Sequence, residues 1–315
     1  MRVVVTGALG HIGSSLIRAL PMEFPGAEIV MIDDLSTQRY VSLFSLPDQA
    51  RYRFVEADVN VVDLAPLLSG ADAVVHLAAI TDAASSFDNA EQVERVNLAA
   101  TVRVANACAE QRVPLVFLST TSVYGSQSEV VDEDCSDSDL QPQSPYADSK
   151  LQAERQLASI GASSDLRFIT CRFGTIFGPS PGMRFHTAVN KFIWQACHHQ
   201  PITVWKSALD QRRPYLDLRD AVAAITHIVR RDLFDNRVYN VLTLNATVRE
   251  IVDAIRTHAA DLEVSLVESR IMNQLSYTVR DARFRSTGFQ PSGSLQEGVA
   301  STFAILRNAG SAVQL

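Results

Sequence analysis

The feature that most constrains the fold is a glycine-rich turn near the N-terminus, in which Gly7, Gly10 and Gly13 follow the spacing GxxGxxG. The turn comes after the β-branched run Arg2–Thr6 and opens an amphipathic segment over Ile12–Leu20. In such a strand–turn–helix unit the first glycine permits a sharp turn, the second admits a pyrophosphate, and the third allows close packing of helix on strand. The helix start adds free N–H groups that favour an anion. The turn therefore predicts a phosphate-binding site, and a ligand-free glycine turn is the alternative.

Short apolar runs alternate with longer amphipathic segments through the first half of the chain. Besides the first run, we expect buried strands at Glu28–Ile32, Tyr52–Glu56, Ala73–Leu77, Leu115–Ser119 and Arg167–Cys171. Two longer segments, Gln92–Gln111 and Tyr146–Ile160, have the pattern of helices. Because each parallel crossover needs a helix, this alternation predicts an α/β fold with a doubly wound parallel sheet.

Composition and charge exclude several classes of protein. The 315 residues are 47% hydrophobic and 20% charged, a balance that suits a packed core and not a disordered, collagen-like or coiled-coil chain. A net charge of −7 offers no domain-wide basic field, so we expect no nucleic-acid partner. No apolar run approaches the ~20 residues of a membrane span, and the N-terminus lacks the pattern of a signal peptide. We expect no membrane association and a cytoplasmic location.

The pattern of the chain changes after about residue 172. A turn-rich stretch around Gly174 and Gly178 is followed by a helix-like segment, Thr187–His199, and by shorter mixed elements. We therefore expect two domains, residues 1–175 and residues 176–315, with the boundary somewhere between 172 and 180. The first would bind the phosphate ligand, and the second would be a smaller α/β domain.

A carboxylate stands where the second predicted strand ends. Asp33 in this position accepts hydrogen bonds from both ribose hydroxyls of an adenosine and repels a 2′-phosphate, which favours NAD over NADP. A reader of the 2′-phosphate would be an arginine directly after the strand, whereas Arg39 lies further along the chain. A strand-end aspartate that only forms a turn is the alternative.

Tyr146 and Lys150 lie one helical turn apart on the same predicted face. A free tyrosine, with a pKa of ~10, is a poor base at neutral pH. A neighbouring ammonium and a positive nicotinamide ring would stabilise the phenolate and lower that pKa. A YxxxK pattern alone is weak evidence, because many surface helices contain it by chance.

Further motifs occur in a fixed order along the chain. They are Asp58-Val59, His76-Leu77-Ala78-Ala79, Asn97, Ser119-Thr120-Thr121-Ser122-Val123-Tyr124-Gly125, Pro145-Tyr146-Ala147-Asp148-Ser149-Lys150 and Arg172. Together with the glycine turn and Asp33, they resemble the extended short-chain dehydrogenase/reductase family, specifically its nucleotide-sugar epimerases and dehydratases. The resemblance covers nearly the whole chain. It implies a Rossmann-like domain that binds NAD and a C-terminal domain that binds a nucleotide-diphosphate sugar.

The resemblance also implies roles for individual residues. Thr120 would hydrogen-bond the sugar O4, Tyr146 would be the catalytic base, and Lys150 would hold the nicotinamide ribose and tune the tyrosine. The residues expected at NAD are Gly7, Gly10, His11, Ile12, Gly13, Asp33, Asp34, Ser36, Asp58, Val59, Leu77, Ala78, Ala79, Asn97, Tyr146, Lys150 and Phe173. For Asn97 a structural role is the alternative. The residues expected at the substrate are Thr81, Thr121, Ser122, Thr175, Asn190, Val204, Arg213 and Arg270.

The substrate side departs from the family pattern. Thr175 replaces the asparagine of the usual RxxN motif, and Arg270 belongs to a shifted version of the late RPGD motif. Arg213 matches the arginine that reaches the substrate pyrophosphate, which suits the two-pronged geometry of a guanidinium. A surface ion pair of Arg213 with Asp217 or Asp220 is the alternative.

The two residues after Thr120 distinguish the possible reactions. Sugar-nucleotide 4,6-dehydratases resemble STDEVYG at this place, because loss of water needs an acid and a base, whereas Thr121 and Ser122 titrate far from neutrality. We therefore expect epimerisation, at C4 or less strongly at C2. The alternatives are a related reductase, decarboxylase or dehydratase, and a cofactor-binding regulator without activity. The regulator is disfavoured by the intact Thr120, Tyr146 and Lys150.

No metal site is expected, because the scattered cysteines form no CxxC pair and the adjacent residues Cys197, His198 and His199 point in different directions on a helix. The resemblance implies a homodimer that pairs Gln92–Gln111 and Tyr146–Ile160 in a four-helix bundle. An apolar stripe fits either that interface or ordinary core packing. It consists of Val93, Val96, Ala100 and Val104.

Overall fold

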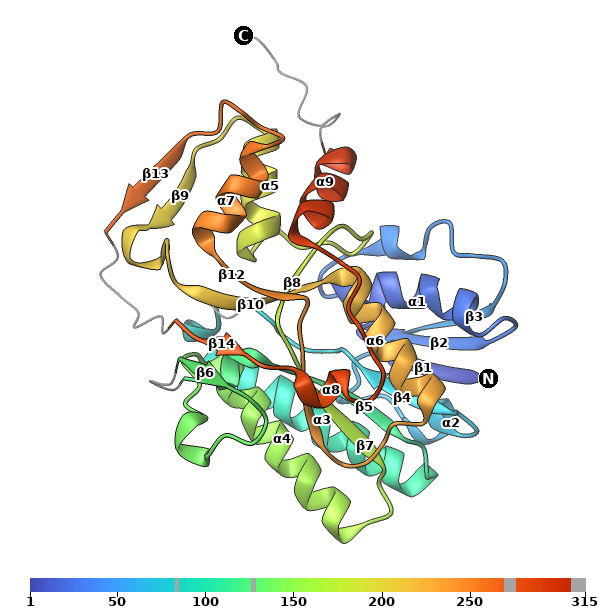
Figure 1. The fold of residues 1–315 in the computed structure, drawn as a ribbon. Coiled ribbons are helices and arrows are strands. Elements are labelled where there is room, and N and C mark those ends of the chain that lie inside the picture. Colours follow the sequence, from blue (N-terminus) through green and yellow to red (C-terminus); the bar gives the residue numbers. More distant parts are fainter. Residues whose placement is uncertain (83–84, 126–128, 269–275, 307–315) are drawn as a thin grey trace.

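The structure of the chain is a computed structural model that describes all residues except 83–84, 126–128, 269–275 and 307–315. A large parallel sheet with helices on both faces lies beside a smaller region built from the later part of the chain (Figure 1). The order of its seven strands is β11-β7-β5-β4-β1-β2-β3, and every neighbouring pair is parallel. The strands are β1 Arg2–Thr6, β2 Glu28–Asp33, β3 Arg51–Glu56, β4 Ala73–His76, β5 Leu115–Thr120, β7 Phe168–Phe173 and β11 Val238–Val241. This architecture confirms the predicted Rossmann-like α/β class.

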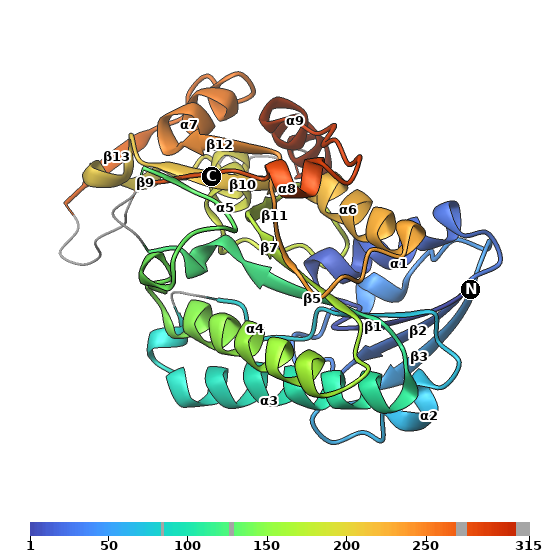
Figure 2. The same cartoon turned by 60° about the horizontal axis from the view of Figure 1, so that its bottom comes forward.

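Consecutive apolar residues make the central strands suitable for burial on both faces. In β1, Val3 and Val5 pack on one side of the sheet, and Val4 packs on the other. One face is covered by α1 (His11–Glu23) and α6 (Leu218–Arg231). The opposite face is covered by α2 (Ala65–Leu68), α3 (Ala90–Gln111) and α4 (Pro145–Ser163), with α3 and α4 side by side (Figure 2). In the described part of the chain, no helix has the length and apolar character that a bilayer crossing requires.

The start of α4 is fixed by local sequence signals. The Ser144 hydroxyl caps the helix by accepting a hydrogen bond from the Ala147 N–H at 3.2 Å, and Pro145 occupies the first helical position. This start places Tyr146 in the first turn, where it faces the carboxyl end of β5.

The smaller region contains a three-stranded sheet and two short strand pairs. Its strands are β8 Thr175–Phe177, β10 Arg212–Asp217 and β12 Leu244–Thr247 in the sheet, β9 Ile202–Trp205 with β13 Val264–Val267, and β6 Val130–Val131 with β14 Thr278–Val279. Its helices are α5 Ala188–Cys197, α7 Val248–Arg256, α8 Ala282–Arg285 and α9 Leu295–Leu306. Along the described chain as a whole, short 3₁₀ turns lie at η1 Tyr40–Leu43, η2 Ser85–Phe87, η3 Thr121–Val123, η4 Asp137–Asp139 and η5 Lys206–Ala208. A separate apolar core joins α5, α7 and α9.

The predicted division between residues 175 and 176 needs one correction. After β10 the chain returns to the large sheet, where β11 pairs with β7 and α6 packs beside α1. The reason is physical: β7 would otherwise leave an open edge, and the amphipathic α6 covers sheet surface that α1 leaves free. A single cut in the sequence therefore does not separate the two regions.

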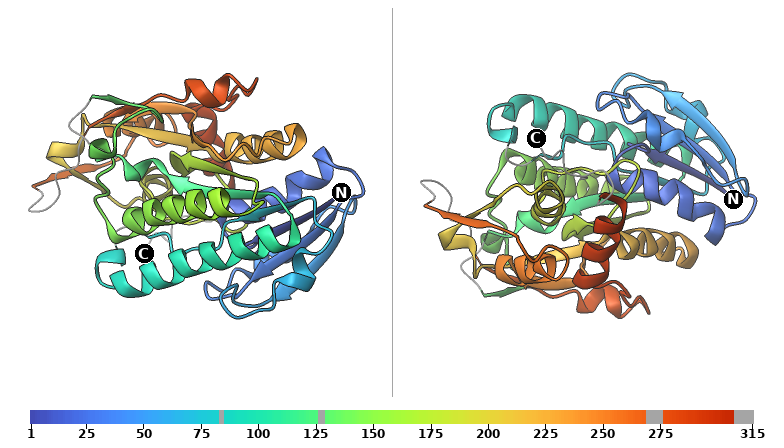
Figure 3. Two further views of the ribbon diagram at one scale, coloured as in Figure 1. Left: turned by 90° about the horizontal axis from the view of Figure 1, so that it is seen from below. Right: turned by 90° about the horizontal axis from the view of Figure 1, so that it is seen from above.

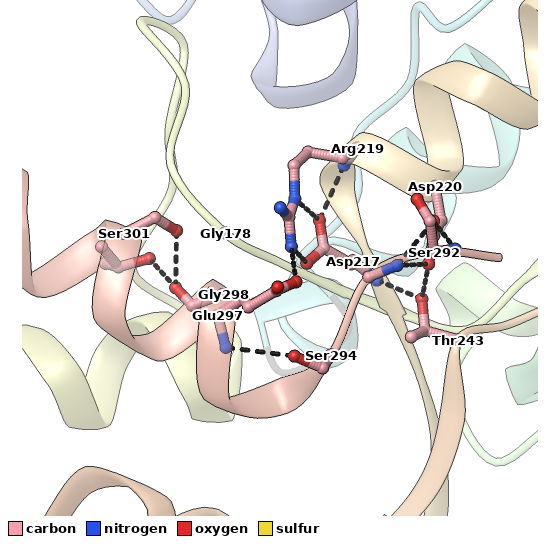
Figure 4. A network of polar contacts seen from close by, with 12 residues as sticks. Gly178, Asp217, Arg219, Asp220, Thr243, Ser292, Ser294, Glu297, Gly298 and Ser301 are labelled. Carbon is pink, nitrogen blue, oxygen red and sulfur yellow. Dashed lines mark hydrogen bonds and ion pairs between the residues drawn. The ribbon is translucent and has the colours of Figure 1, made fainter. Parts of the chain in front are cut away.

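Two aspartates at the junction of β10 and α6 fasten the C-terminal segment. Asp217 accepts hydrogen bonds from the Arg219 N–H at 2.8 Å and from its guanidinium Nη2 at 2.9 Å. Asp220 accepts the N–H groups of Ser292 at 2.8 Å and of Gly293 at 3.1 Å (Figure 4). Asp220 thus joins the segment before α9 directly to the start of α6, and Asp217 acts through Arg219, whose Nη2 also donates to Glu297 on α9 at 2.9 Å.

The apolar stripe considered for a dimer interface belongs largely to the monomer's core. Val93, Ala100 and Val104 on α3 are each at most 1% exposed, and the last two lie in the core between α3 and the sheet. Val96 lines the large cavity described below. Core packing therefore explains the stripe without a second subunit.

Candidate active site

A cavity of about 1460 Å³ opens at the carboxyl ends of the parallel strands and extends to the smaller region. It surrounds the point between β1 and β4 where the strand order reverses, which is where open α/β sheets bind ligands. Residues after β1, β2, β4, β5 and β7 line one part, and residues of β10 and of the segment between β8 and α5 line the other.

The glycine turn has the geometry of a phosphate cradle. Gly7 has a φ of +63°, and a Cβ there would lie 2.6 Å from the Ala78 nitrogen. A Cβ on Gly13 would lie 2.4 Å from the Gly7 carbonyl oxygen, so that position also excludes a side chain. At Gly10, by contrast, a Cβ would meet only that same oxygen at 3.2 Å and the tip of Arg39 at 3.9 Å. The start of α1 is thus exposed to the cavity, and this arrangement fits the pyrophosphate of NAD.

Asp33 holds the turn while it faces the cavity. One carboxylate oxygen accepts the Leu9 N–H at 3.0 Å, and the other accepts the Leu35 N–H at 3.0 Å. Burial raises the pKa of Asp33, and these two N–H donors oppose the shift. Each oxygen keeps a further lone pair for a ribose hydroxyl. Arg39, which the sequence did not assign, lies over the turn and attracts the same carboxylate.

The three predicted catalytic residues come together where β5 meets α4. Thr120 ends β5 and bonds to the Tyr146 hydroxyl. The buried Lys150 donates from Nζ to the Leu118 carbonyl at 2.9 Å and lies 4.8 Å from the centre of the Phe117 ring. Burial lowers the pKa of Lys150 to about 8. The chain therefore combines a proton acceptor, a hydroxyl and a cation around one point of the cavity.

A second cation approaches Tyr146 from the segment between β8 and α5. Loss of water raises the pKa of Tyr146, whereas the charge of Arg184 and the Thr120 hydroxyl lower it. The segment is pinned to the first helix by the Gly182 N–H, which donates to the Ser14 hydroxyl at 2.9 Å. A Cβ on Gly182 would lie 2.3 Å from the Leu9 oxygen. The sequence showed this stretch only as turn-rich, so nothing in its spacing identified Arg184.

Most of the predicted binding residues line this cavity. On the cofactor side these are Gly7, Gly10, His11, Ile12, Gly13, Asp33, Asp34, Ser36, Asp58, Val59, Leu77, Ala78, Ala79, Tyr146, Lys150 and Phe173. On the substrate side they are Thr81, Thr121, Ser122, Thr175 and Arg213. Arg270 lies outside the described residues.

Asn190 and Val204 do not line the cavity. The Asn190 side chain accepts the Gly178 N–H at 3.1 Å and donates to the Arg184 carbonyl at 3.2 Å. It therefore shapes the segment that carries Arg184, because its side-chain oxygen and nitrogen both hydrogen-bond to the backbone of that segment. Val204 packs in the core of the smaller region, and Trp205 beside it reaches the cavity instead.

Asn97, expected at the cofactor, is also a structural residue. Its side-chain oxygen accepts the Ile80 N–H at 2.8 Å, and its nitrogen donates to the Ile80 carbonyl at 2.9 Å and to the Ser149 hydroxyl at 3.1 Å. It ties the segment after β4 to α4 and so fixes the cavity wall from behind.

Arg213 lies in the cavity and not in a surface ion pair. Its guanidinium stands 4.8 Å from the centre of the Tyr277 ring, and the Tyr277 hydroxyl donates to the Thr121 carbonyl at 3.1 Å. The alternative pairing fails because Asp217 and Asp220 bind other groups. Tyr277, which the sequence analysis missed, thus connects Arg213 to the turn that follows β5.

The histidines singled out in the sequence have structural surroundings. His76 is buried, and its Nδ1 lies 2.7 Å from the Thr6 hydroxyl. The His198 ring lies against Trp194 in a tilted arrangement with ring centres 4.1 Å apart, while the exposed His199 faces Asp261. Among the described residues, no three His, Cys, Asp or Glu side chains gather as metal ligands would.

Comparisons with known proteins agree with this geometry. Residues 3–241 match the NAD dependent epimerase/dehydratase family. An uncharacterized UDP-glucose epimerase of Bacillus subtilis is 29% identical over 318 residues, which cover 97% of this chain and 98% of that relative. A dTDP-D-glucose 4,6-dehydratase of Mus musculus is 28% identical over 316 residues, covering 96% of this chain and 87% of that one.

Solved structures show the same fold and, in one case at comparable identity, the same kind of cofactor. MoeE5 in complex with UDP-glucose and NAD has a TM-score of 0.84 and 28% identity, covering 99% of this chain and 100% of that one. The fold also matches UDP-glucuronic acid 4-epimerase from Bacillus cereus, with a TM-score of 0.89, 24% identity, and coverage of 98% and 100%. With the glycine turn, Asp33 and the Tyr146–Lys150 pair in place, the chain belongs to the NAD dependent epimerase/dehydratase family, and its cofactor is NAD.

Proposed function

We propose that the protein inverts C4 of the sugar in a nucleotide-diphosphate sugar, without net oxidation or reduction. The proposal rests on three groups around one point of the cavity: the Tyr146 phenol, the Thr120 hydroxyl and the Lys150 ammonium. Family membership supplies NAD as the cofactor.

These residues suffice for the proton chemistry of such a reaction. The Thr120 hydroxyl hydrogen-bonds the sugar O4. The Tyr146 oxygen takes the proton from the sugar's O4 hydroxyl while a hydride leaves C4. NAD bound at the glycine turn would supply the hydride acceptor and donor that the reaction needs. Tyr146 then gives the proton back to the same oxygen after the sugar has presented its other face. The Arg184 charge favours the phenolate that starts the cycle. We propose that the Lys150 ammonium, one turn further along α4, supports the same phenolate.

The observation that carries epimerisation over dehydration is the chemistry of the turn after Thr120. Thr121 donates its hydroxyl to the Phe173 carbonyl at 3.2 Å, which ties it to the neighbouring strand. The Ser122 N–H donates a hydrogen bond to the Thr120 hydroxyl oxygen at 3.1 Å. Neither side chain titrates near neutrality, so this turn lacks the acid and base that removal of water requires.

A 4,6-dehydratase is the second candidate. Dehydratases are among the relatives of comparable identity, and a carboxylate from elsewhere in the fold, Asp82, lines the cavity and attracts Arg184. Asp82 could supply a titratable group that the turn after β5 lacks. A reductase or decarboxylase would likewise use Tyr146 and NAD but would change the mass of the sugar.

We propose a nucleotide-diphosphate sugar as substrate because Arg213 offers a guanidinium on the far wall of the cavity. The test incubates purified protein with NAD and with UDP-, dTDP-, GDP- and CDP-linked sugars, and follows products by NMR. We expect one nucleotide series to give a C4 epimer. A panel in which none of the sugars changes would contradict the proposal.

We also propose a homodimer that pairs α3 and α4 of two subunits. The two helices lie side by side at the surface of the molecule (Figure 3). A groove is lined by α3 residues between Glu91 and Glu110. Both helices expose charged residues such as Arg95 and Arg155, so the interface would depend on ion pairs more than on apolar burial. Sedimentation at micromolar concentration tests this, and a monomer at 0.15 M salt would refute it.

A cytoplasmic location stays a proposal as well. All four cysteines lie among the described residues and all are free, as a reducing compartment would allow. Fractionation of cells that express the native chain is the measurement, and recovery from a membrane or extracellular fraction would contradict the proposal.

A further inference from the structure

A buried ion pair lies directly behind the catalytic strand. The side chains of Arg172 and Glu154 are 5% and 6% exposed, and Arg172 Nη2 lies 2.6 Å from Glu154 Oε2. The guanidinium makes a second bond from Nε to Oε1 at 3.0 Å and a third from Nη1 to the Tyr124 hydroxyl at 2.9 Å. The Ser119 hydroxyl donates to the same carboxylate. Because desolvation largely cancels the attraction within a buried pair, stability alone is a weak reason for this arrangement.

The pair fixes how α4 lies on β5. Glu154 follows Lys150 by one turn on α4, and Ser119 follows Leu118 on β5. Helix and strand therefore meet at three successive points. Lys150 donates to the Leu118 carbonyl, and Glu154 accepts from the Ser119 hydroxyl. The hydroxyl of Thr120, the next residue of the strand, bonds to Tyr146. A shift of α4 by one residue would break all three contacts, so the network sets the register on which the catalytic pair depends.

The same carboxylate also acts on Lys150. Burial lowers the pKa of Lys150 to about 8, and the Glu154 charge opposes that shift. From β4, the buried His76 faces the same ammonium, and burial and that charge lower the pKa of His76 to about 3, so the imidazole is neutral near pH 7. Arg172 approaches from β7 but is paired with Glu154, and Tyr146 lies one turn earlier on α4. The charge of Lys150 thus depends on Glu154.

We propose that Glu154, held by Arg172 and Ser119, is a positioning residue that fixes α4 on β5 and supplies the negative charge that keeps the Lys150 ammonium charged beneath the active site. The inference rests on the proposed function, in which Tyr146 exchanges the substrate proton and Lys150 supports its phenolate. It adds a residue that touches neither cofactor nor substrate but determines the pH range of turnover.

The test is the pH profile of kcat for the holoenzyme and its variants. In the wild type, kcat falls above about pH 8, because Lys150 is charged only below its pKa. Glu154→Gln removes a charge that raises this pKa, so the alkaline limb moves to lower pH by about one unit or more. Glu154→Asp keeps the charge and holds the limb within a few tenths of a unit of the wild type. An alkaline limb that stays in place in Glu154→Gln overturns the proposal.

Two further variants separate this effect from simple loss of structure. Glu154→Gln leaves Arg172 unpaired, so Glu154→Gln combined with Arg172→Met restores a neutral interior and should still show the shifted limb. Asp148→Asn removes a carboxylate from an exposed position of the same helix and should leave the limb in place. If kcat falls at the same alkaline pH in all folded variants, and only their thermal stability is lower, the network is merely structural.

The wild type alone also bears on the proposal, and one variant separates it from the proposed function. A wild-type kcat that stays flat from pH 7 to pH 9.5 overturns the role of Glu154 even if no variant folds. If Tyr146→Phe keeps its turnover, the proposed function itself has failed. If Tyr146→Phe is inactive but the limb of Glu154→Gln does not move, only the role of Glu154 is wrong.

Discussion

The cofactor side and the substrate side of the cavity are built in different ways. On the cofactor side, Gly7, Asp33 and Leu77 each lie where a parallel strand ends, and neighbouring strands bring those ends to one edge. On the substrate side, Arg213 and Tyr277 come from segments far apart in the sequence, which meet where the Tyr277 N–H donates to the Arg212 carbonyl at 3.1 Å. A site made of strand ends is encoded locally, whereas a site made between regions depends on how the whole chain folds.

The two sides are nevertheless joined. The segment that carries Arg184 is fastened to the cofactor turn by Gly182 and to α5 by Asn190. This link runs through the segment that carries Arg184 and not through Arg213 or Tyr146, so substitutions at those two positions should leave NAD binding unchanged.

The largest effect is expected from Tyr146→Phe. The ring still packs but accepts no proton, so kcat should fall by about 10²–10⁴-fold, the usual contribution of a general base. NAD binding, measured by calorimetry, should stay within about twofold, because the cofactor turn is unchanged. Tyr40→Phe, at an exposed position, is the matched control and should retain full activity. Wild-type turnover in Tyr146→Phe would disprove the assigned base.

Arg213→Leu should affect the substrate side alone. Charge-assisted hydrogen bonds contribute about 1.5–3 kcal/mol, so affinity for the nucleotide sugar should fall by roughly 10–100-fold. NAD affinity should not change. Arg212→Leu removes the neighbouring charge on the same strand, which does not line the cavity, and should leave substrate affinity near the wild-type value. Equal losses in both variants would place the substrate elsewhere.

Thr120→Val tests the junction between the two sides. The variant loses one hydroxyl that bonds Tyr146 and, in the proposed reaction, the sugar O4. One hydrogen bond of about 1–1.5 kcal/mol corresponds to roughly a tenfold lower kcat. The measurement is steady-state kinetics at saturating substrate. A loss as large as that of Tyr146→Phe would show that Thr120 does more than hold an oxygen.

The smallest effect is expected from Asp33→Asn. The amide keeps one oxygen acceptor for the backbone of the turn but loses the charge that repels a 2′-phosphate. Calorimetry should show that the wild type strongly prefers NAD over NADP. In the variant, NAD affinity should be about fivefold lower and the preference for NAD weaker. Equal wild-type affinity for NAD and NADP would refute the role of Asp33, and it would point to Arg39 as a phosphate contact.

The sequence contained enough information for the cofactor side because its rules are local. The Arg2–Thr6 strand, the GxxGxxG turn and the start of α4 are each determined by neighbouring residues, and the structure places all three within one residue of expectation. The central strands could be identified for the same reason, because their consecutive apolar residues indicate burial on both faces of the sheet.

The substrate side required tertiary information. The contribution of Arg184 depends on where Gly182 packs, and Asn190 shapes a neighbouring segment because that segment folds back onto it. β11 returns to the large sheet after a long excursion, which no local pattern indicates. The same limit explains the unassigned Tyr277, whose hydroxyl reaches the turn after β5 from the far end of the chain.

The measurement that tests the central proposal most directly is the mass and the C4 configuration of the product. Purified protein with NAD and its nucleotide-sugar substrate would be analysed by mass spectrometry and by NMR of the sugar ring. Inversion at C4 by Tyr146 and Thr120 predicts a product of unchanged mass with an altered H4 coupling pattern. A product lighter by one water would contradict it and would make the protein a dehydratase whose acid and base lie outside Thr121 and Ser122.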